Sequence, residues 1–139
     1  MLDINSIAID PELARKGVWA DYMGGSFLLA RRGPEHDARL GQLYNENEAV
    51  IKQENEEGTR MLSHIYQRAF CDTILLDWKN VGAAGKAIKF SPDEAMKIIS
   101  DPRFTELAVF LEKFSLHHSN YTQMQNSKVA KNVKNSAAS

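Results

Sequence analysis

The apolar residues near the start of the chain form two short runs, at 18–22 and 27–31, with a Gly-Gly pair between them. A glycine pair in this position is typical of the turn of a β-hairpin. A short helix is expected just before the hairpin, because Asp10 can act as the N-cap of a helix that begins at Pro11. A hairpin alone is marginally stable, so the pattern predicts that it packs on the elements that follow.

From residue 34 onward, apolar residues recur at spacings of three and four, which predicts amphipathic helices. The first helix is expected from about 34 to 55, and residues 56–59 break or bend it. Thr59 can then cap a second helix, which ends across residues 74–78. This second helix carries the strongest apolar stripe of the chain: Met61, Leu62, Ile65, Tyr66, Ala69, Phe70 and Ile74.

The next third of the chain contains two further helix starts. A short strand is expected at 87–90, where it could pair with the hairpin. Ser91 followed by proline and two acids opens a short helix, as in a capping box. Asp101 followed by proline caps another helix. The apolar residues that this last helix is expected to turn toward the core are Phe104, Leu107, Ala108, Leu111 and Phe114.

These elements place the chain in the α+β class, predominantly helical, with the N-terminal β-hairpin packed on a bundle of about four helices. With 139 residues, the chain is long enough for one domain with a sizeable core. We expect a single globular domain over residues 1–119 and a polar, basic C-terminal tail over residues 120–139. The tail is expected to be disordered or frayed, the alternative being a segment that folds on a partner.

The charge balance argues against a nucleic-acid partner. Lys and Arg number 17 and Asp and Glu 18, for a net charge of −1, whereas nucleic-acid binders carry a basic surface. No apolar run approaches the ~20 residues of a membrane span, and the first residues do not resemble a signal peptide. We therefore expect no membrane partner. The single cysteine, Cys71, suits a reducing cytoplasm.

Three groups of residues resemble reactive sites but fail on spacing. The Gly-rich segment 80–87 lacks the glycine and the Ser or Thr that a phosphate-binding loop needs at its two ends. His117 and His118 are adjacent, so on a helix they point about 100° apart and cannot easily share a metal ion. His64 and Cys71 share a helix face but lie about 10.5 Å apart along it, too far for a nucleophile and its base. We expect no enzyme, no catalytic residue, no metal site and no cofactor.

Four aromatic residues are expected to anchor the core: Trp19, Trp78, Phe90 and Phe104. Each tryptophan would be half-buried, with its indole N–H on a polar partner. Because tryptophan is also enriched at interface hot spots, a protein-binding role for the two tryptophans stays open.

Gly17-Val18-Trp19, residues 75–81, residues 90–95 and residues 101–104 resemble, in that order, segments of the small tail assembly chaperones of long-tailed, siphovirus-type bacteriophages. The resemblance implies a non-catalytic adaptor in the host cytoplasm. It would bind the tape-measure protein, promote assembly of the tail-tube protein around it, and be absent from the mature virion. The alternative is a small phage-encoded regulatory or inhibitor protein that acts by protein–protein binding.

The C-terminal helix and the residues after it carry more apolar and aromatic side chains than one buried stripe requires. They are Phe110, Phe114, Leu116, Tyr121 and Met124. A chaperone for a long amphipathic helix needs an apolar groove or an exposed helix face. We therefore expect part of this set to contact the tape-measure protein or a second copy of the chain, as in a homo-oligomer.

Overall fold

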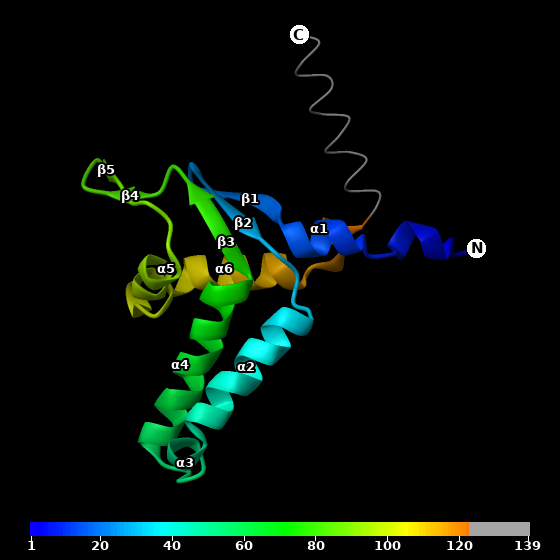
Figure 1. The fold of residues 1–139 in the computed structure, drawn as a ribbon. Coiled ribbons are helices and arrows are strands. Elements are labelled where there is room, and N and C mark those ends of the chain that lie inside the picture. The colour runs from blue at the N-terminus through cyan, green and yellow to red at the C-terminus, as the bar shows by residue number, and fades with distance from the viewer. Residues whose placement is uncertain (123–139) are drawn as a thin grey trace.

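A computed structural model describes residues 1–122 (Figure 1). Helices dominate, and the strands form two small antiparallel sheets, which confirms the predominantly helical α+β class. The elements follow in the order η1 (Ile4–Ile7), α1 (Pro11–Lys16), β1 (Val18–Tyr22), β2 (Gly25–Leu29), α2 (Pro34–Glu46), α3 (Glu48–Ile51), α4 (Glu56–Thr73), β3 (Leu75–Lys79), β4 (Gly82–Ala83), β5 (Lys86–Ala87), α5 (Pro92–Ile99), η2 (Pro102–Phe104), α6 (Thr105–Leu116) and η3 (His118–Tyr121).

The predicted hairpin is confirmed as β1 and β2, which pair antiparallel with Tyr22 opposite Gly25. The two residues between them, Met23 and Gly24, have φ of 48° and 90°. Two positive φ values in a two-residue loop match the twist of the flanking strands. The glycine takes this conformation without strain, and the exposed Met23 takes it at the tip of the hairpin.

The main sheet has a third strand, β3, which lies where the apolar pattern predicts the end of a helix, at residues 74–78. β3 pairs antiparallel with β2 and places Trp78 opposite Phe27. A β-bulge interrupts this pairing, because Leu29 lies opposite Leu75 while Leu28 lies opposite Asp77. The extra residue removes the strict alternation by which a strand is recognised in a sequence.

Residues 87–90 do not form the pairing with the hairpin that the sequence leaves possible. β5 pairs instead with β4, in a separate two-stranded sheet. The turn between them has positive φ at Ala84 and Gly85, so the Gly-rich segment that superficially resembles a phosphate loop is the tip of this small hairpin.

Helices α2 and α4 run side by side away from the main sheet, with α3 at their far end (Figure 1). The predicted helix over 34–55 is interrupted at Asn47, whose side chain donates a hydrogen bond to the Leu43 carbonyl (2.8 Å). The residue that caps α4 is Asn55 and not Thr59, since the Asn55 side chain accepts from the Gly58 N–H (2.9 Å). The paired helices enclose a small apolar cluster around Leu43, Ile65 and Ala69.

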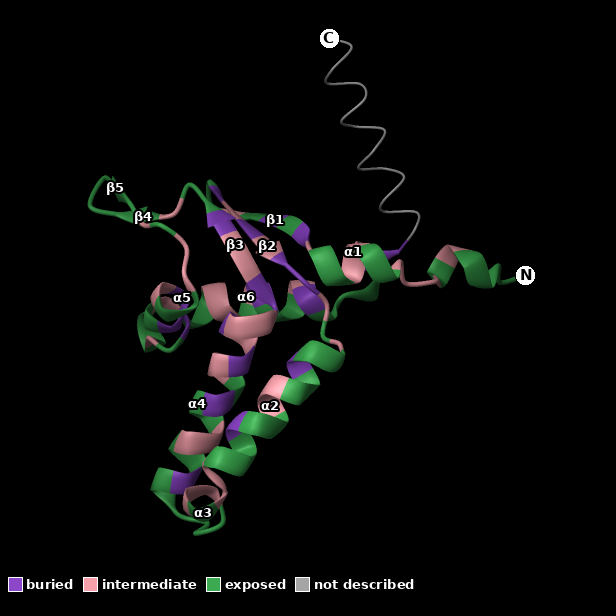
Figure 2. Ribbon diagram, viewed as in Figure 1, coloured by how far each residue is buried: buried purple, intermediate pink, exposed green. Residues whose placement is uncertain are grey.

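The main core lies where the sheet, the C-terminal half of α4, α5 and α6 meet (Figure 2). Helix α5 begins as predicted: the Ser91 hydroxyl accepts a hydrogen bond from the Glu94 N–H (3.0 Å). Asp101 caps η2, and only then does α6 begin. The core residues are Ala20, Phe27, Leu29, Cys71, Ile74, Leu75, Trp78, Ala95, Met96, Ile99 and Leu111.

A partly buried ion network links α2, α4 and α5. The Asp72 carboxylate accepts hydrogen bonds from Arg68 Nη2 (2.6 Å) and Arg39 Nε (2.9 Å), and Arg68 Nη1 also bonds Asp93 (2.8 Å). Burial acts to raise the pKa of Asp72, but the hydrogen bonds from the two arginines outweigh it and hold this pKa below its usual value. The network therefore joins α2 and α4 to each other and to α5.

The fold closes with residues beyond the expected domain boundary at 119. Tyr121 is fully buried and donates a hydrogen bond from its hydroxyl to the Leu29 carbonyl (3.0 Å). Thr122 is also buried and forms a β-bridge with Ile9. The described part of the domain thus extends through Thr122, and the remainder of the expected tail lies outside the described residues.

Gly58→Ala is expected to lower the free energy of unfolding by about 1–3 kcal/mol. A Cβ at this buried position would lie 2.8 Å from the Val50 carbonyl oxygen and 3.1 Å from that of Ile51, so α3 would have to move. The control is Gly41→Ala in α2, where a Cβ meets nothing within 4 Å and the substitution should stabilise the helix slightly. Urea denaturation followed by circular dichroism measures both. Equal stability of the two variants would contradict the prediction.

Candidate functional site

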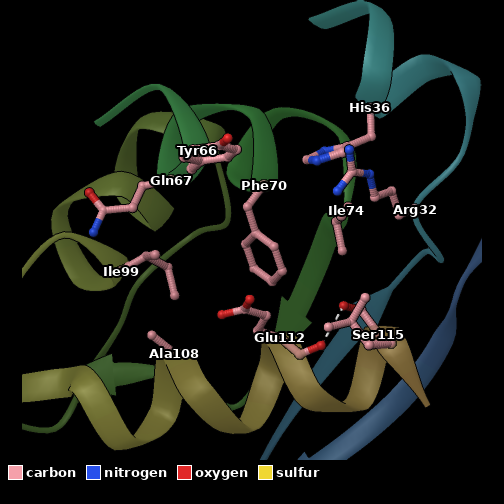
Figure 3. Close-up of a pocket in the computed structure, with 11 residues that line it drawn as sticks. Arg32, His36, Tyr66, Gln67, Phe70, Ile74, Ile99, Ala108, Glu112 and Ser115 are labelled. Atoms are coloured by element: carbon pink, nitrogen blue, oxygen red, sulfur yellow. Dashed lines mark hydrogen bonds between the residues drawn. The ribbon is translucent and has the colours of Figure 1, made fainter. Parts of the chain in front are cut away.

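Two hollows adjoin on one side of α4. The first, of about 290 Å³, lies between α4, α6 and the end of α5 (Figure 3). The second, of about 370 Å³, lies between α4 and α2. Arg32 and Tyr66 line both hollows, so together they form one surface depression, which we call the α4 groove.

The floor of the α4 groove is a column of side chains at four-residue spacing, Leu62, Tyr66, Phe70 and Ile74. Tyr66 is exposed, Leu62 and Phe70 are half-buried, and Ile74 is buried in the main core. This column extends about 18 Å along the helix, or slightly more than three turns. The neighbouring column, with Ile65 and Ala69, is buried against α2, and Leu62 packs on the same cluster. The broad apolar stripe predicted for this helix therefore serves two purposes, one inside the helix pair and one in the groove.

The far wall of the first hollow is α6, which contributes Ala108, Glu112 and Leu116, one from each turn. Leu116, at the end of α6, is 56% exposed, and Tyr66 on the floor is 51% exposed. Two large apolar side chains thus remain in water at one depression. Such a patch on a small domain marks an interaction site more often than an isolated exposed residue does.

Arg32 and His36 form the opposite rim of the first hollow (Figure 3). Arg32 Nε bonds Asp37 (2.8 Å). His36 is buried, and its Nδ1 lies 3.0 Å from the Thr73 hydroxyl oxygen. Because that hydroxyl donates its hydrogen to the Ala69 carbonyl (2.7 Å), we assign Nδ1 as the protonated ring nitrogen. Burial, and then the nearby charge of Arg32, hold the pKa of His36 below its usual value, so the ring is neutral at pH 7.

Glu112 supplies the negative charge of the groove. Its side chain points from α6 toward Phe70 across the first hollow (Figure 3). Within residues 1–122 no hydrogen bond or ion pair engages its carboxylate. The groove therefore combines an apolar floor with one carboxylate that has no cationic partner in the described structure.

Only one of the five residues expected to bind a partner lines this groove, namely Leu116. Phe110 and Phe114 lie partly buried against the main core instead, with the Phe110 ring 4.9 Å from that of Tyr22. Tyr121 was expected at the surface, but it is fully buried and unavailable to a partner. Met124 lies outside the described residues.

The four expected anchors divide into two pairs. Trp78 is 6% exposed, its indole N–H donates to the Ile88 carbonyl (2.7 Å), and Phe90 packs edge-on against it with ring centroids 5.1 Å apart. Trp19 is half-buried as expected, at 37% exposed, but it lies at the surface with the Lys79 ammonium 4.2 Å from its ring centre. Phe104 is also exposed, since it belongs to η2 before α6 turns inward.

Two candidate reactive side chains, Cys71 and His118, have structural surroundings in the described chain. Cys71 is fully buried in the core, and burial raises the pKa of its thiol to about 12, so the thiolate that a nucleophile requires is scarce at neutral pH. His118 contacts the Ile7 carbonyl. Among residues 1–122, no three His, Cys, Asp or Glu side chains are grouped so as to hold a metal ion. Within the same residues, no helix has both the length and the apolarity to cross a membrane.

A family model described as "YdaY prophage protein" matches residues 34–132. The chain belongs to this family. It is therefore a small protein of phage origin. The matched region begins at the first residue of α2 and includes every helix that lines the α4 groove, whereas the β1–β2 hairpin lies before it. No curated protein and no solved structure matches the chain.

The apolar stripe predicted for α4 includes the groove floor, and the structure buries Ile74 in the main core while it leaves Tyr66 exposed. The width of this apolar stripe is the signal that could have indicated a groove beside the core. Met61, Leu62, Ile65 and Ala69 already provide one apolar face for α2, and the exposed Tyr66 is a large side chain beyond what that face needs. The groove itself cannot be read from the sequence, because its far wall is α6, which only folding brings opposite α4.

Proposed function

We propose that this prophage protein is a non-catalytic tail assembly chaperone. It binds a helical segment of the tape-measure protein in the α4 groove and promotes assembly of the tail-tube protein around it. It acts in the host cytoplasm and leaves before the virion is complete. The observation that carries the proposal is the pair of exposed apolar side chains in the α4 groove, Tyr66 (51% exposed) and Leu116 (56% exposed), because such a patch on a small domain marks an interaction surface.

The dimensions of the groove support a helical partner. The accessible part of the floor, from Leu62 to Phe70, extends about 12 Å and accommodates about two turns of a helix, with an apolar contact at each turn. The two hollows, of about 290 and 370 Å³, lie at the lower end of the range for small-molecule sites, which enclose most of their ligand. Separate shallow hollows along one line suit successive side chains of a docked helix better than one compact ligand.

Exposed apolar residues in the groove also supply the energy that such binding needs. Covering a large apolar side chain such as Tyr66 or Leu116 contributes about 1–2 kcal/mol. A few such residues at the centre of an interface dominate its affinity. Tape-measure proteins are long and rich in helices, so a chaperone of this kind has many amphipathic segments to bind before tube subunits cover them.

The proposal is tested by co-expressing the chain with the tape-measure protein of the same prophage. The wild-type chain should raise the soluble yield of that protein several-fold and co-purify with it. A variant with both Tyr66→Ser and Leu116→Ser should lose about 100-fold in affinity, since each substitution removes a contact worth roughly tenfold. Circular dichroism verifies that this variant folds, as its two positions are exposed.

The matched control is Val109→Ser, which removes a 41% exposed apolar side chain from α6 outside the groove. It should bind like the wild type. Equal solubility of the tape-measure protein with and without the chain would overturn the chaperone function. Full binding by the folded double variant would overturn the groove as its site. Gene order provides a separate check, since a chaperone gene should lie between a tail-tube gene and a very long helix-rich reading frame.

A further inference from the structure

The α4 groove carries an electrostatic asymmetry between its two rims. On the α2 side, Arg32 is paired with Asp37 (2.8 Å), and His36 is neutral because it is buried beside that arginine. On the α6 side, Glu112 has no cationic partner within residues 1–122. Among the described residues that line the groove, the unbalanced charge is therefore negative and lies at Glu112.

The position of Glu112 determines what can reach it. It stands one turn before Leu116 and one turn after Ala108 on the wall of the groove, and its carboxylate is directed toward Phe70 (Figure 3). A lysine or arginine from a bound helix could lay its methylene stem on Phe70 and Leu116 and place its charged end at the carboxylate. An acidic residue in the same place would meet like charge beside an apolar surface, which disfavours binding.

We infer that the α4 groove selects amphipathic helices that carry a basic residue on the flank facing α6, where it pairs with Glu112. This inference rests on the proposed function, since it assumes that the groove binds a helix, and it adds which helices are accepted. The apolar side chains of the helix lie on the accessible part of the column, from Leu62 to Phe70, and on Leu116. The basic residue fixes the direction and rotation of the helix, as charged groups at an interface rim do.

The test uses two synthetic helical peptides of about 16 residues, long enough to form a helix in water. Both carry the same leucine stripe at spacings of three and four, and they differ only in the residues along one flank, which are lysines in one peptide and glutamates in the other. Fluorescence anisotropy measures binding to the full chain. The lysine peptide should bind the wild type about tenfold more tightly than the glutamate peptide, and the difference should shrink in 1 M salt.

Charge variants of the chain locate the effect. Glu112→Gln should weaken binding of the lysine peptide about threefold, and Glu112→Lys about tenfold or more while it improves binding of the glutamate peptide. The control is Glu106→Lys, the same change at an exposed position of α6 outside the groove, which should leave the preference intact. Circular dichroism establishes that each variant is folded.

Several outcomes would overturn the inference. These are equal affinities for the two peptides, no binding of either peptide, or a preference that survives Glu112→Lys. If the same substitution changes the sedimentation of the chain alone, the groove is occupied by a second copy, which also contradicts the inference. Failure of the proposed function gives a different result, because the tape-measure protein would then remain insoluble with the wild-type chain whatever the peptides show.

Discussion

Tyr121→Ala is expected to lower the free energy of unfolding by about 4 kcal/mol, because it removes one of the largest fully buried side chains of the described structure. The Tyr121 ring packs edge-on against Phe114 with centroids 6.3 Å apart, and its hydroxyl bonds the Leu29 carbonyl in the central strand. Since small domains are stable by about 5–15 kcal/mol in total, the variant should retain little folded population at 37 °C. Urea denaturation followed by circular dichroism measures the loss.

Two further variants separate packing from hydrogen bonding at this position. Tyr121→Phe keeps the ring and loses only the hydroxyl, so its cost should be about 1 kcal/mol. A chain that ends at Asn120 should be destabilised as much as Tyr121→Ala, relative to a chain that ends at Thr122. If both truncated chains unfold at the same urea concentration, Tyr121 does not hold the end of the chain in the core.

The same comparison bears on how partner binding is tested. Removal of everything after Asn120 would weaken binding simply by unfolding the core that supports α6, because the Asp10 N–H also bonds the Tyr121 carbonyl (2.8 Å). Substitutions at Tyr66 and Leu116 avoid this difficulty, since both side chains are exposed on the groove surface. Partner binding is therefore better tested by substitutions in α4 and the last turn of α6 than by truncation of the chain.

Local signals in the sequence predicted the local parts of the fold. Asp10, Ser91 and Asp101 are the N-caps of the helical segments that follow them, and the Gly-Gly pair marked the hairpin. Each of these features depends on residues a few positions apart. Strand β3 depends on pairing with β2 about fifty residues away and contains a bulge, so neither its partner nor its alternation could be read from the local pattern.

The candidate site shows the same limit. Leu116 was predicted to bind a partner as one of five apolar residues beyond what one buried stripe needs, and the structure places it on the wall of the groove. Phe110, Phe114 and Tyr121 met the same criterion, but tertiary packing places Phe110 against Tyr22 and buries Tyr121 beneath the strands. Glu112 carried no signal at all, since a carboxylate on a helix is ordinarily solvated. Its relevance comes from facing Phe70 across a depression that only the folded chain forms.

Trp78→Ala should cost about 4 kcal/mol as well, and it should also detach a specific part of the molecule. The Trp78 ring packs edge-on against Phe27 in β2 and Phe90 before α5, and its indole N–H bonds the Ile88 carbonyl just after β5. The side chain therefore joins the main sheet to the segment that carries the β4–β5 hairpin. Loss of the ring should increase hydrogen exchange at residues 81–90 before the rest of the core is affected.

Trp19→Ala is the matched control, because it removes the same side chain from a 37% exposed position on the adjacent hairpin. It should cost about 1 kcal/mol and leave hydrogen exchange at 81–90 unchanged, since Trp19 contacts Lys79 in place of the core. Each variant retains one tryptophan, so fluorescence provides an internal check. Fluorescence of the Trp19→Ala protein comes from the buried Trp78 alone. It should have its maximum at a shorter wavelength than that of the Trp78→Ala protein, and the maximum should shift to longer wavelength on unfolding. If both variants were equally stable, Trp78 would not be the residue that joins these segments.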